Sequence, residues 1–337
     1  MSQPTVSLQD IAKRLGVSAK TVSGALHNRS IRMSDETRER IRALAKELGY
    51  TPNLVARGMR QGVMPIVGMV AEGLITQPFA TEIMRSFDNV LRIDGLNVFV
   101  TNIGRGQSVA TGVAELQRLM PRSIVYASMF HQVVSLPPSV RGVIALMINC
   151  REEHDAIPAL VPAEYDAAVT ITAFMLGRGR RAIAFLNLPG LLAGEMRAAG
   201  FRQAHRVRGL NLNDDWIRPA TRGARYSDRA RSLVHDRIRE WYAGKARPDA
   251  ILCGNDRVAL EVYGALRRVN LRIPEDVAVA SFDNQIEIAA RLDPPLTTMA
   301  LPHREMGRRA GEILAGHGAV PRTVEEIPFR LVERASV

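Results

Sequence analysis

The sequence has little cysteine and no long apolar run. Its only two cysteines, Cys150 and Cys253, each end an apolar segment. We therefore expect buried free thiols, and neither a disulfide framework nor a cysteine-rich metal site. No stretch approaches the roughly 18 apolar residues that cross a membrane, and the first ten residues lack the charged-then-apolar pattern of an export signal. These absences predict a cytoplasmic chain with no membrane partner.

The motifs of common enzyme classes are also missing. The sequence contains no glycine-rich phosphate loop, no HExxH, no GxSxG, and no His/Cys cluster with metal-ligand spacing. The segment GRGRRA at 177–182 is strongly basic and follows an expected helix, which is the opposite of a dinucleotide-binding fingerprint. We expect no catalytic residues, no cofactor and no metal.

Positive charge is concentrated at the start of the chain. The formal net charge is +11, and residues 1–60 hold 11 Lys/Arg against 5 Asp/Glu, a difference of +6. A concentrated positive charge favours binding to a polyanion through counterion release, although charge alone is equally compatible with a solvated surface. The motifs must distinguish these two interpretations.

Residues 7–48 have helical spacing and no alternating apolar run. Ser18 and Ser34 are placed to cap a second and a third helix, and Gly16 and Gly49 to end the first and the third. One apolar stripe is expected on each helix: Leu8, Ile11, Ala12 and Leu15; Val22, Ala25 and Leu26; Ile41, Leu44, Ala45 and Leu48. We predict an all-helical domain over residues 1–50.

Beyond Pro65 short β-rich runs alternate with helical ones. The expected strands are 66–70, 96–101, 123–127, 142–148, 182–186, 250–254 and 277–282. The expected crossover helices are 79–91, 110–119, 167–176 and 257–269. This rhythm predicts βαβ units, and the number of strands exceeds one small sheet. We predict two doubly wound parallel-sheet lobes over 63–337, with ligands at the carboxyl ends of the strands.

The segment VSAKTVSGAL at 17–26 has the pattern of a helix-turn-helix recognition helix. Its first residues are small or polar and its later apolar residues face inward. Ala19 and Lys20 are expected to reach base edges, and Ser18, Thr21 and Ser23 to donate to phosphates. The alternative is a three-helix bundle without a DNA partner.

Residues 6–61, from VSLQDIAKRLGVS to LGYTPNLVARGMRQG, closely resemble the N-terminus of the LacI family of repressors. The resemblance implies a hinge helix and linker at 51–62 that folds on DNA and inserts Met59 into the minor groove. It adds as DNA contacts Asn28, Asn53 and Ala56. Gly24 and His27 replace the arginine and asparagine that family members often carry, so direct base contacts on this helix face are expected to be few.

Most of residues 62–330 resembles the periplasmic-binding-protein-like core of the same family. The resemblance rests on GRGRRAIAFL (177–186), EMRAAGF (195–201), CGNDRVALEVYGALRRVNLRIPEDVAVASFDN (253–284) and PPLTTMALPHREMG (294–307). It implies effector contacts at Asp166, Arg197, Asn255 and Asp283. Further candidates are Glu72, Phe79, Tyr226 and His303. Carboxylates, a guanidinium and an amide suit a polyol; helix capping for Asn255 and a surface role for Arg197 stay open.

These expectations together describe a DNA-binding regulator. We expect a homodimer on a roughly palindromic double-stranded operator, and a mono- or oligosaccharide effector between the lobes. A purine or phosphorylated-sugar corepressor is the alternative effector. A solute-binding transport protein would share the lobes, but it would need an export signal and would have no DNA-binding head.

Overall fold

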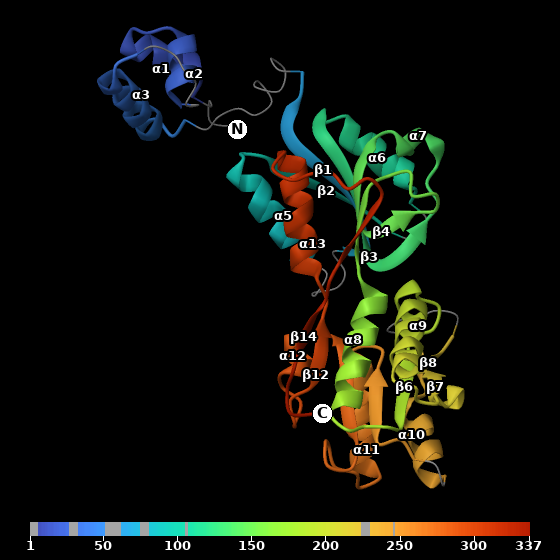
Figure 1. Cartoon of the computed structure of the whole chain (residues 1–337). Coiled ribbons are helices and arrows are strands. Elements are labelled where there is room, and N and C mark those ends of the chain that lie inside the picture. Colours follow the sequence, from blue (N-terminus) through green and yellow to red (C-terminus); the bar gives the residue numbers. More distant parts are fainter. Residues whose placement is uncertain are drawn as a thin grey trace. The chain divides into compact units, whose positions relative to one another are not determined.

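A computed structural model describes residues 6–26, 33–50, 62–74, 81–104, 107–223, 230–244 and 247–337 (Figure 1). The chain divides into two compact units, Met1–Met64 and Pro65–Val337, and each unit is described by itself. The expected hinge and linker at 51–62 lie almost wholly outside the described residues, so the domain boundaries stay predictions.

The first unit consists of helices throughout its described residues. Its elements are α1 (Leu8–Leu15), α2 (Ala19–Leu26) and α3 (Asp35–Glu47). The three expected apolar stripes meet in one core, in which the fully or nearly fully buried members are Ile11, Ala12, Val22, Ala25, Ile41 and Ala45. The helix assignments made from the sequence are therefore confirmed.

The caps explain where these helices begin and end. Ser18 Oγ accepts the Thr21 amide at 3.0 Å, and Ser34 Oγ accepts the Thr37 amide at 3.2 Å, so both predicted serine caps are present. Gly16 ends α1 with φ at 65°, a left-handed conformation that costs glycine little.

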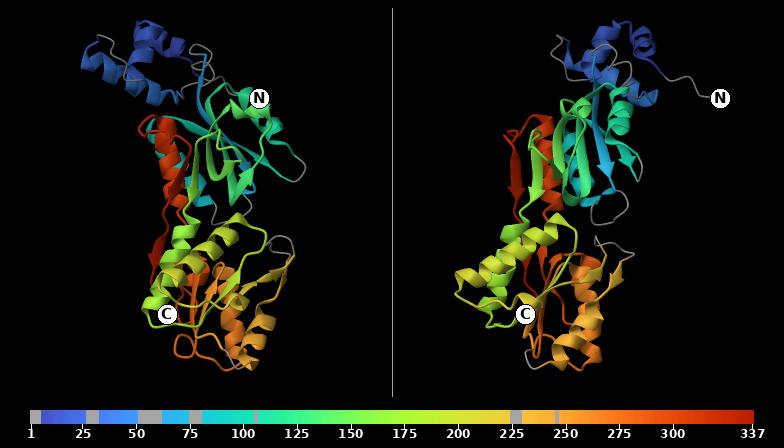
Figure 2. Two further views of the ribbon diagram at one scale, coloured as in Figure 1. Left: turned by 45° about the vertical axis from the view of Figure 1, so that its right-hand side comes forward. Right: turned by 90° about the vertical axis from the view of Figure 1, so that its right-hand side faces the viewer.

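The second unit contains two six-stranded sheets with helices on both faces (Figures 1 and 2). Sheet A has the order β13-β5-β4-β3-β1-β2. Its strands are β1 (Met64–Glu72), β2 (Asn97–Ile103), β3 (Pro121–Val134), β4 (Ile144–Glu152), β5 (Ala159–Pro162) and β13 (Val324–Ile327). The pairs β1–β2, β3–β4, β4–β5 and β5–β13 are parallel, as the predicted βαβ rhythm requires.

Sheet B has the order β14-β12-β11-β10-β6-β7. Its strands are β6 (Ile183–Asn187), β7 (Ile217–Pro219), β10 (Ala250–Cys253), β11 (Ala278–Asp283), β12 (Thr297–Ala300) and β14 (Arg330–Val332). Only the β12–β14 pair is antiparallel among the pairs described in this sheet. A small hairpin joins β8 (Thr221–Arg222) to β9 (Arg231–Ser232).

Each sheet is buried on both faces because its strands alternate between two helical layers. In β1, Val67, Met69 and Ala71 pack toward α5 (Thr81–Ile93) and α13 (His303–Ala315). Sheet B likewise has one apolar cluster on each of its two faces, where its strands pack against helices. The other helices of the second unit are α6 (Val109–Gln117), α7 (Pro138–Arg141), α8 (Glu164–Gly177), α9 (Leu192–Val207), α10 (Val234–Ala243), α11 (Asp256–Arg268), α12 (Ile286–Ala289) and the 3₁₀ turn Asp214–Trp216.

The chain crosses between the two lobes three times. It passes from β5 into α8, from β12 into α13, and from β13 into β14. Since β5, β12 and β13 each end at a crossing, the carboxyl ends of strands parallel to them also lie at the junction of the lobes. The predicted doubly wound architecture is confirmed, and it brings together the sheet edges at which such folds bind ligands.

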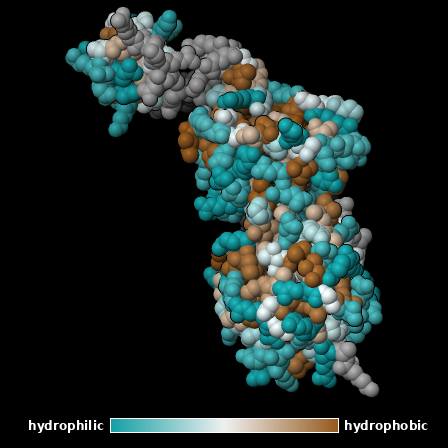
Figure 3. Space-filling view, viewed as in Figure 1, coloured by the Kyte–Doolittle hydropathy of each residue, from teal (hydrophilic) through white to brown (hydrophobic). Residues whose placement is uncertain are grey.

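Hydrophobic and hydrophilic side chains are mixed on the visible face of the second unit (Figure 3). Among the described residues no helix combines the length and hydrophobicity needed to span a bilayer.

Candidate functional site

In the first unit, the start of α2 places Ser18 and Lys20 away from the helical core. Lys20 is exposed, whereas Val22 and Ala25 are buried. Ser18 and Thr21 lie together at the helix start, where their hydroxyls are 2.8 Å apart. The helix thus presents hydroxyl groups, a lysine and the positive end of its dipole at one end, a combination suited to a phosphate backbone.

The remaining predicted DNA contacts are partly buried or lie outside the described residues. Ala19 and Ser23 lie on α2 and are partly buried, and Ala19 packs against the helical core. Asn28, Asn53, Ala56 and Met59 lie outside the described residues.

In the second unit, the candidate site centres on Arg197 of α9. The side chain is buried, with 3% of the residue exposed, so the alternative of a solvated surface arginine is excluded. Its Nε donates to Glu164 Oε2 at 2.7 Å, and its Nη1 donates to the Gly254 carbonyl at 2.5 Å. The guanidinium carbon lies 4.2 Å from the centre of the Phe282 ring, a cation–π distance.

Glu164, in the first turn of α8, is the acid that the sequence analysis missed. Asp166, which was selected instead, is exposed. Two residues along an α-helix correspond to a rotation of about 200°, so Asp166 points away from the side that contacts Arg197. Burial raises the pKa of Glu164, and the guanidinium of Arg197 acts in the opposite direction.

Asp283 lies at the carboxyl end of β11, as predicted. Its φ of 108° is unusual for a residue other than glycine and is a sign of local strain. Gln285 Nε2 donates to its Oδ2 at 3.0 Å. Burial raises the pKa of Asp283 to about 7, opposed by Arg197 and reinforced by the nearby Asp256 and Glu164.

Asn255 follows β10 and has the capping role that the sequence left open. Its Oδ1 accepts the Val258 amide at 3.0 Å and begins α11. Its Nδ2 makes no hydrogen bond with any described residue, so the amide group remains available as a donor while the oxygen caps the helix.

The next residue, Asp256, is a fully buried carboxylate that organises this edge of sheet B. It accepts the Gln285 amide at 2.6 Å and the Thr298 hydroxyl at 2.9 Å, and Ser281 also donates to it. Burial raises the pKa of Asp256 to about 6 despite these hydrogen bonds. The network fixes the turn after β11 and therefore the position of Asp283.

On the sheet A side, Glu72 ends β1 as predicted. Its Oε2 accepts the Tyr126 hydroxyl at 2.5 Å and Gln132 Nε2 at 2.6 Å. These bonds place the end of β1 beside the final part of β3, at the edge expected to face a ligand.

His131 of β3 connects this edge to the Arg197 group and was also missed. Its Nδ1 lies 3.9 Å from Glu164 Oε1 and is buried without a hydrogen-bond partner among the described residues. Burial, followed by the positive charges of Arg197 and Arg151, lowers the pKa of His131 to about 4. The ring is therefore neutral near pH 7.

The other candidates are less closely tied to this group. His303 begins α13, directly after a crossing, and is buried. Phe79 and Tyr226 lie outside the described residues. The expected buried free thiols are confirmed for Cys150 and Cys253.

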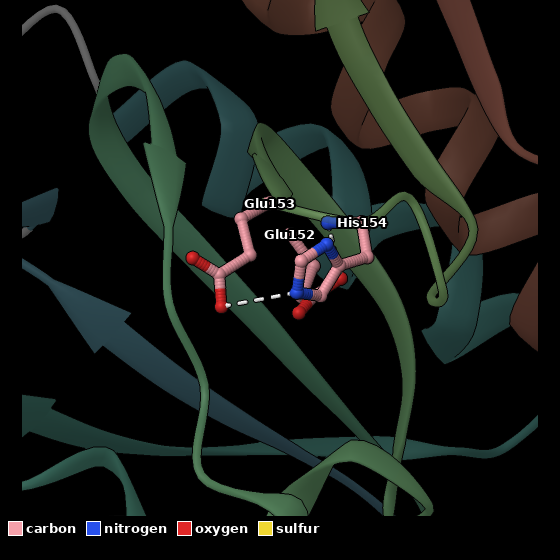
Figure 4. Close-up of side chains that lie close together, drawn as sticks. All are labelled: Glu152, Glu153 and His154. Atoms are coloured by element: carbon pink, nitrogen blue, oxygen red, sulfur yellow. Dashed lines mark hydrogen bonds and ion pairs between the residues drawn. The ribbon is translucent and has the colours of Figure 1, made fainter.

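Glu152, Glu153 and His154 form a separate cluster after β4, with potential ligand atoms within 4.8 Å of one another (Figure 4). Arg141 Nη2 lies 3.0 Å from Glu152 Oε1 and 3.3 Å from Glu153 Oε1. Burial favours the neutral form of Glu152, but the amides of His154 and Ala156, together with Arg141, outweigh it and lower its pKa. Because these groups already balance the carboxylates, the cluster is best described as an ion-pair network.

A helix-turn-helix head followed by two doubly wound lobes, with polar groups converging at their sheet edges, defines the class of ligand-responsive DNA-binding regulators. Residues 7–53 match the family described as bacterial regulatory proteins, lacI family. Residues 172–337 match the periplasmic binding protein-like domain.

Individual proteins agree with these matches. The sucrose operon repressor of Escherichia coli is 35% identical over 338 residues, covering 98% of this chain and 99% of the relative. The HTH-type transcriptional repressor PurR of Vibrio cholerae is 28% identical over 322 residues, covering 91% and 90%. The crystal structure of the lac repressor dimer bound to operator and the anti-inducer ONPF has a TM-score of 0.73 at 22% identity and 99% coverage of both chains, so it has the same fold. This chain belongs to the lacI family of bacterial regulatory proteins, as its sequence motifs predicted.

Proposed function

We propose that this chain is a cytoplasmic transcription repressor that binds operator DNA as a homodimer and changes its operator affinity when a disaccharide binds at the junction of its lobes. Sucrose is the first candidate, because the sucrose operon repressor is similar to this chain over nearly its full length. The observation that carries the proposal is the buried Arg197, paired with Glu164 and lying against Phe282 at the edge of sheet B. We assign the chain no enzymatic activity.

The chemistry of this edge suits a polyol. Asp283 supplies an acceptor, and the free Nδ2 of Asn255 supplies a donor. No hydrogen bond joins Arg197 Nη2 to any described residue, so this group is a second donor. Sugar hydroxyls both donate and accept, and a site of this kind orients them by several fixed polar groups.

The DNA-binding part of the proposal rests on the exposed end of α2. We assign Lys20 a role in base selection, and Ser18, Thr21 and Ser23 roles at phosphates. A two-fold symmetric operator follows from a two-fold dimer. Met59 is assigned to minor-groove insertion by the resemblance to the family.

The alternative effector is a purine or a phosphorylated sugar that strengthens DNA binding. The 28% identity to a PurR repressor favours keeping it. A ligand shifts operator affinity only by its differential affinity for two arrangements of the protein, so the direction of the change must be measured.

The test uses the full-length protein. Bound sites are selected from random DNA, and affinity for the selected site is measured by fluorescence anisotropy with and without sucrose, glucose 6-phosphate or hypoxanthine. We expect a two-fold symmetric site and a weakening of at least about tenfold by sucrose alone. Tightening by hypoxanthine or glucose 6-phosphate, with no response to sucrose, would establish the alternative.

A further inference from the structure

Among the described residues, the cation of the proposed effector site is Arg197, and it is already paired with a carboxylate of the protein. Arg197 is the guanidinium that faces this edge of sheet B, and its Nε is bound by Glu164 at 2.7 Å. Both side chains are almost fully buried, with 3% and 2% exposed. An ion pair so far removed from water is little screened by salt.

The remaining charges near this pair do not restore a positive field. Asp283 interacts electrostatically with Arg197, Glu164 and Asp256. The only neighbouring imidazole of β3, His131, is neutral near pH 7 because its pKa is lowered to about 4. A second arginine, Arg334, interacts electrostatically with Asp256 and favours its charged form. Arg151, the other arginine whose charge reaches His131, pairs with Asp155 at 2.8 Å. Glu164 is therefore the carboxylate that opposes the Arg197 guanidinium, and Asp283, with its pKa raised to about 7, adds negative charge only in its ionised fraction.

The donors of Arg197 are partly occupied by the protein itself. Phosphate and carboxylate ligands bind arginine best through two parallel N–H donors. Here Nε donates to Glu164 and one N–H of Nη1 donates to the Gly254 carbonyl, so the Nε edge of the guanidinium is not open to a second anion. The N–H groups that remain on Nη1 and Nη2 can serve a hydroxyl oxygen, whereas a phosphate bound there would lie close to the Glu164 carboxylate.

We propose that Glu164 is a specificity-determining residue that excludes anionic ligands and restricts the effector site to neutral polyols. This inference rests on the proposed function, since it concerns the same site. It assigns Glu164 a role beyond holding Arg197 in place, because a purely structural partner would be indifferent to the charge of the ligand.

The test compares sucrose with sucrose 6-phosphate, which differ only by the phosphate, using isothermal titration calorimetry on the full-length protein. The variant Glu164→Gln keeps the size of the side chain and an oxygen acceptor for Arg197 Nε. The matched control is Asp214→Asn, which removes a carboxylate of the same lobe that pairs with Arg202 at the exposed surface.

For the wild type we expect at least tenfold tighter binding of sucrose than of sucrose 6-phosphate. In Glu164→Gln the affinity for sucrose 6-phosphate should rise at least tenfold, whereas that for sucrose should change less than threefold. Asp214→Asn should behave as the wild type.

Three results would overturn the inference. Equal or tighter binding of sucrose 6-phosphate by the wild type would refute it without using any variant, and would leave a sugar-responsive repressor in place. An equal change for both ligands in a folded Glu164→Gln protein would reduce Glu164 to a structural partner. Binding of neither ligand by the wild type would remove the disaccharide proposal and this inference with it.

Discussion

The two lobes present chemically different edges to their junction. On the sheet A side, Glu72 is held by a phenol and an amide, Tyr126 and Gln132. On the sheet B side, Arg197, Glu164 and Asp283 form a group of interacting charges beneath which Asp256 fixes the backbone. From this difference we infer that sheet B determines which ligand binds, while sheet A adds further hydrogen-bonding contacts.

The largest effect is expected from Arg197→Ala. The substitution leaves Glu164 buried without its partner, which typically costs about 3–5 kcal/mol of stability. We expect a sucrose affinity at least about a hundredfold lower and a clearly lower melting temperature, measured by calorimetry and thermal denaturation.

The matched control is Arg202→Ala on the same helix. Arg202 pairs with Asp214 at 3.2 Å, but both side chains are exposed, so the loss should be below about 1 kcal/mol. Equal effects of the two substitutions would remove the special role of the sheet B edge.

The second prediction concerns pH and Asp283. An aspartate titrates near ~4 in an unfolded chain, whereas burial raises the pKa of Asp283 to about 7. Between these values the folded state retains a proton that the unfolded state has lost, so this residue makes stability fall as pH rises from about 4 to 7. Asp283→Asn removes that contribution. The melting temperature of Asp283→Asn minus that of the wild type should therefore rise by several degrees as the pH is raised from about 5 to about 7.5.

Asp276→Asn is the control of opposite sign. Hydrogen bonds from Arg272 lower the pKa of Asp276, so its stabilising effect is present at neutral pH and is lost as pH falls through the folded-state pKa. This variant should be closest to wild type at low pH. A flat difference for Asp283→Asn would show that its carboxylate is not destabilised by burial.

The third prediction tests the sheet A edge. Tyr126→Phe removes the 2.5 Å hydrogen bond to Glu72 and should cost about 1 kcal/mol. We expect sucrose affinity to fall less than about fivefold, far less than for Arg197→Ala. Tyr242→Phe, which removes a 2.8 Å hydrogen bond to the Pro248 carbonyl, should cost similar stability without changing binding. A larger binding loss in Tyr126→Phe than in Arg197→Ala would reverse the proposed roles of the lobes.

The smallest effect is expected at the remote acidic cluster of the first lobe. Glu153→Gln should leave sucrose affinity unchanged, and addition of Zn²⁺ to the wild type should not raise the melting temperature, because both carboxylates of this cluster already pair with Arg141. Metal-dependent stabilisation that is lost in Glu153→Gln would show that a site had been overlooked there.

Local patterns predicted the fold better than they predicted the site. The apolar runs that became β1, β6, β10 and β11 are β-rich and bounded by turn residues, so each was found. The strands β5, β12, β13 and β14, which have three or four residues each, were not found. They are defined by pairing with neighbours distant in sequence, and a local pattern contains no information on such pairing.

The site shows the same limit at the level of single residues. Arg197 and Asp283 were found because they stand in recognisable segments. Asp166 was named from the family resemblance and Glu164 was not considered, because residue type and approximate position do not fix the rotational phase of a helix, and two residues reverse the side that a residue faces. His131 was missed because a histidine within a strand has no distinguishing pattern until its neighbours in space are known.

The threefold crossing of the chain has a consequence for recombination between relatives. The ligand-selecting lobe is built from two separate pieces of sequence, 164–300 and 330–337, because α13 and β13 return to the other lobe between them. A chimera made with a single junction would combine halves of sheets that never packed together. Exchanging effector preference by domain grafting requires both pieces to be transplanted at once, with three junctions placed at the crossings.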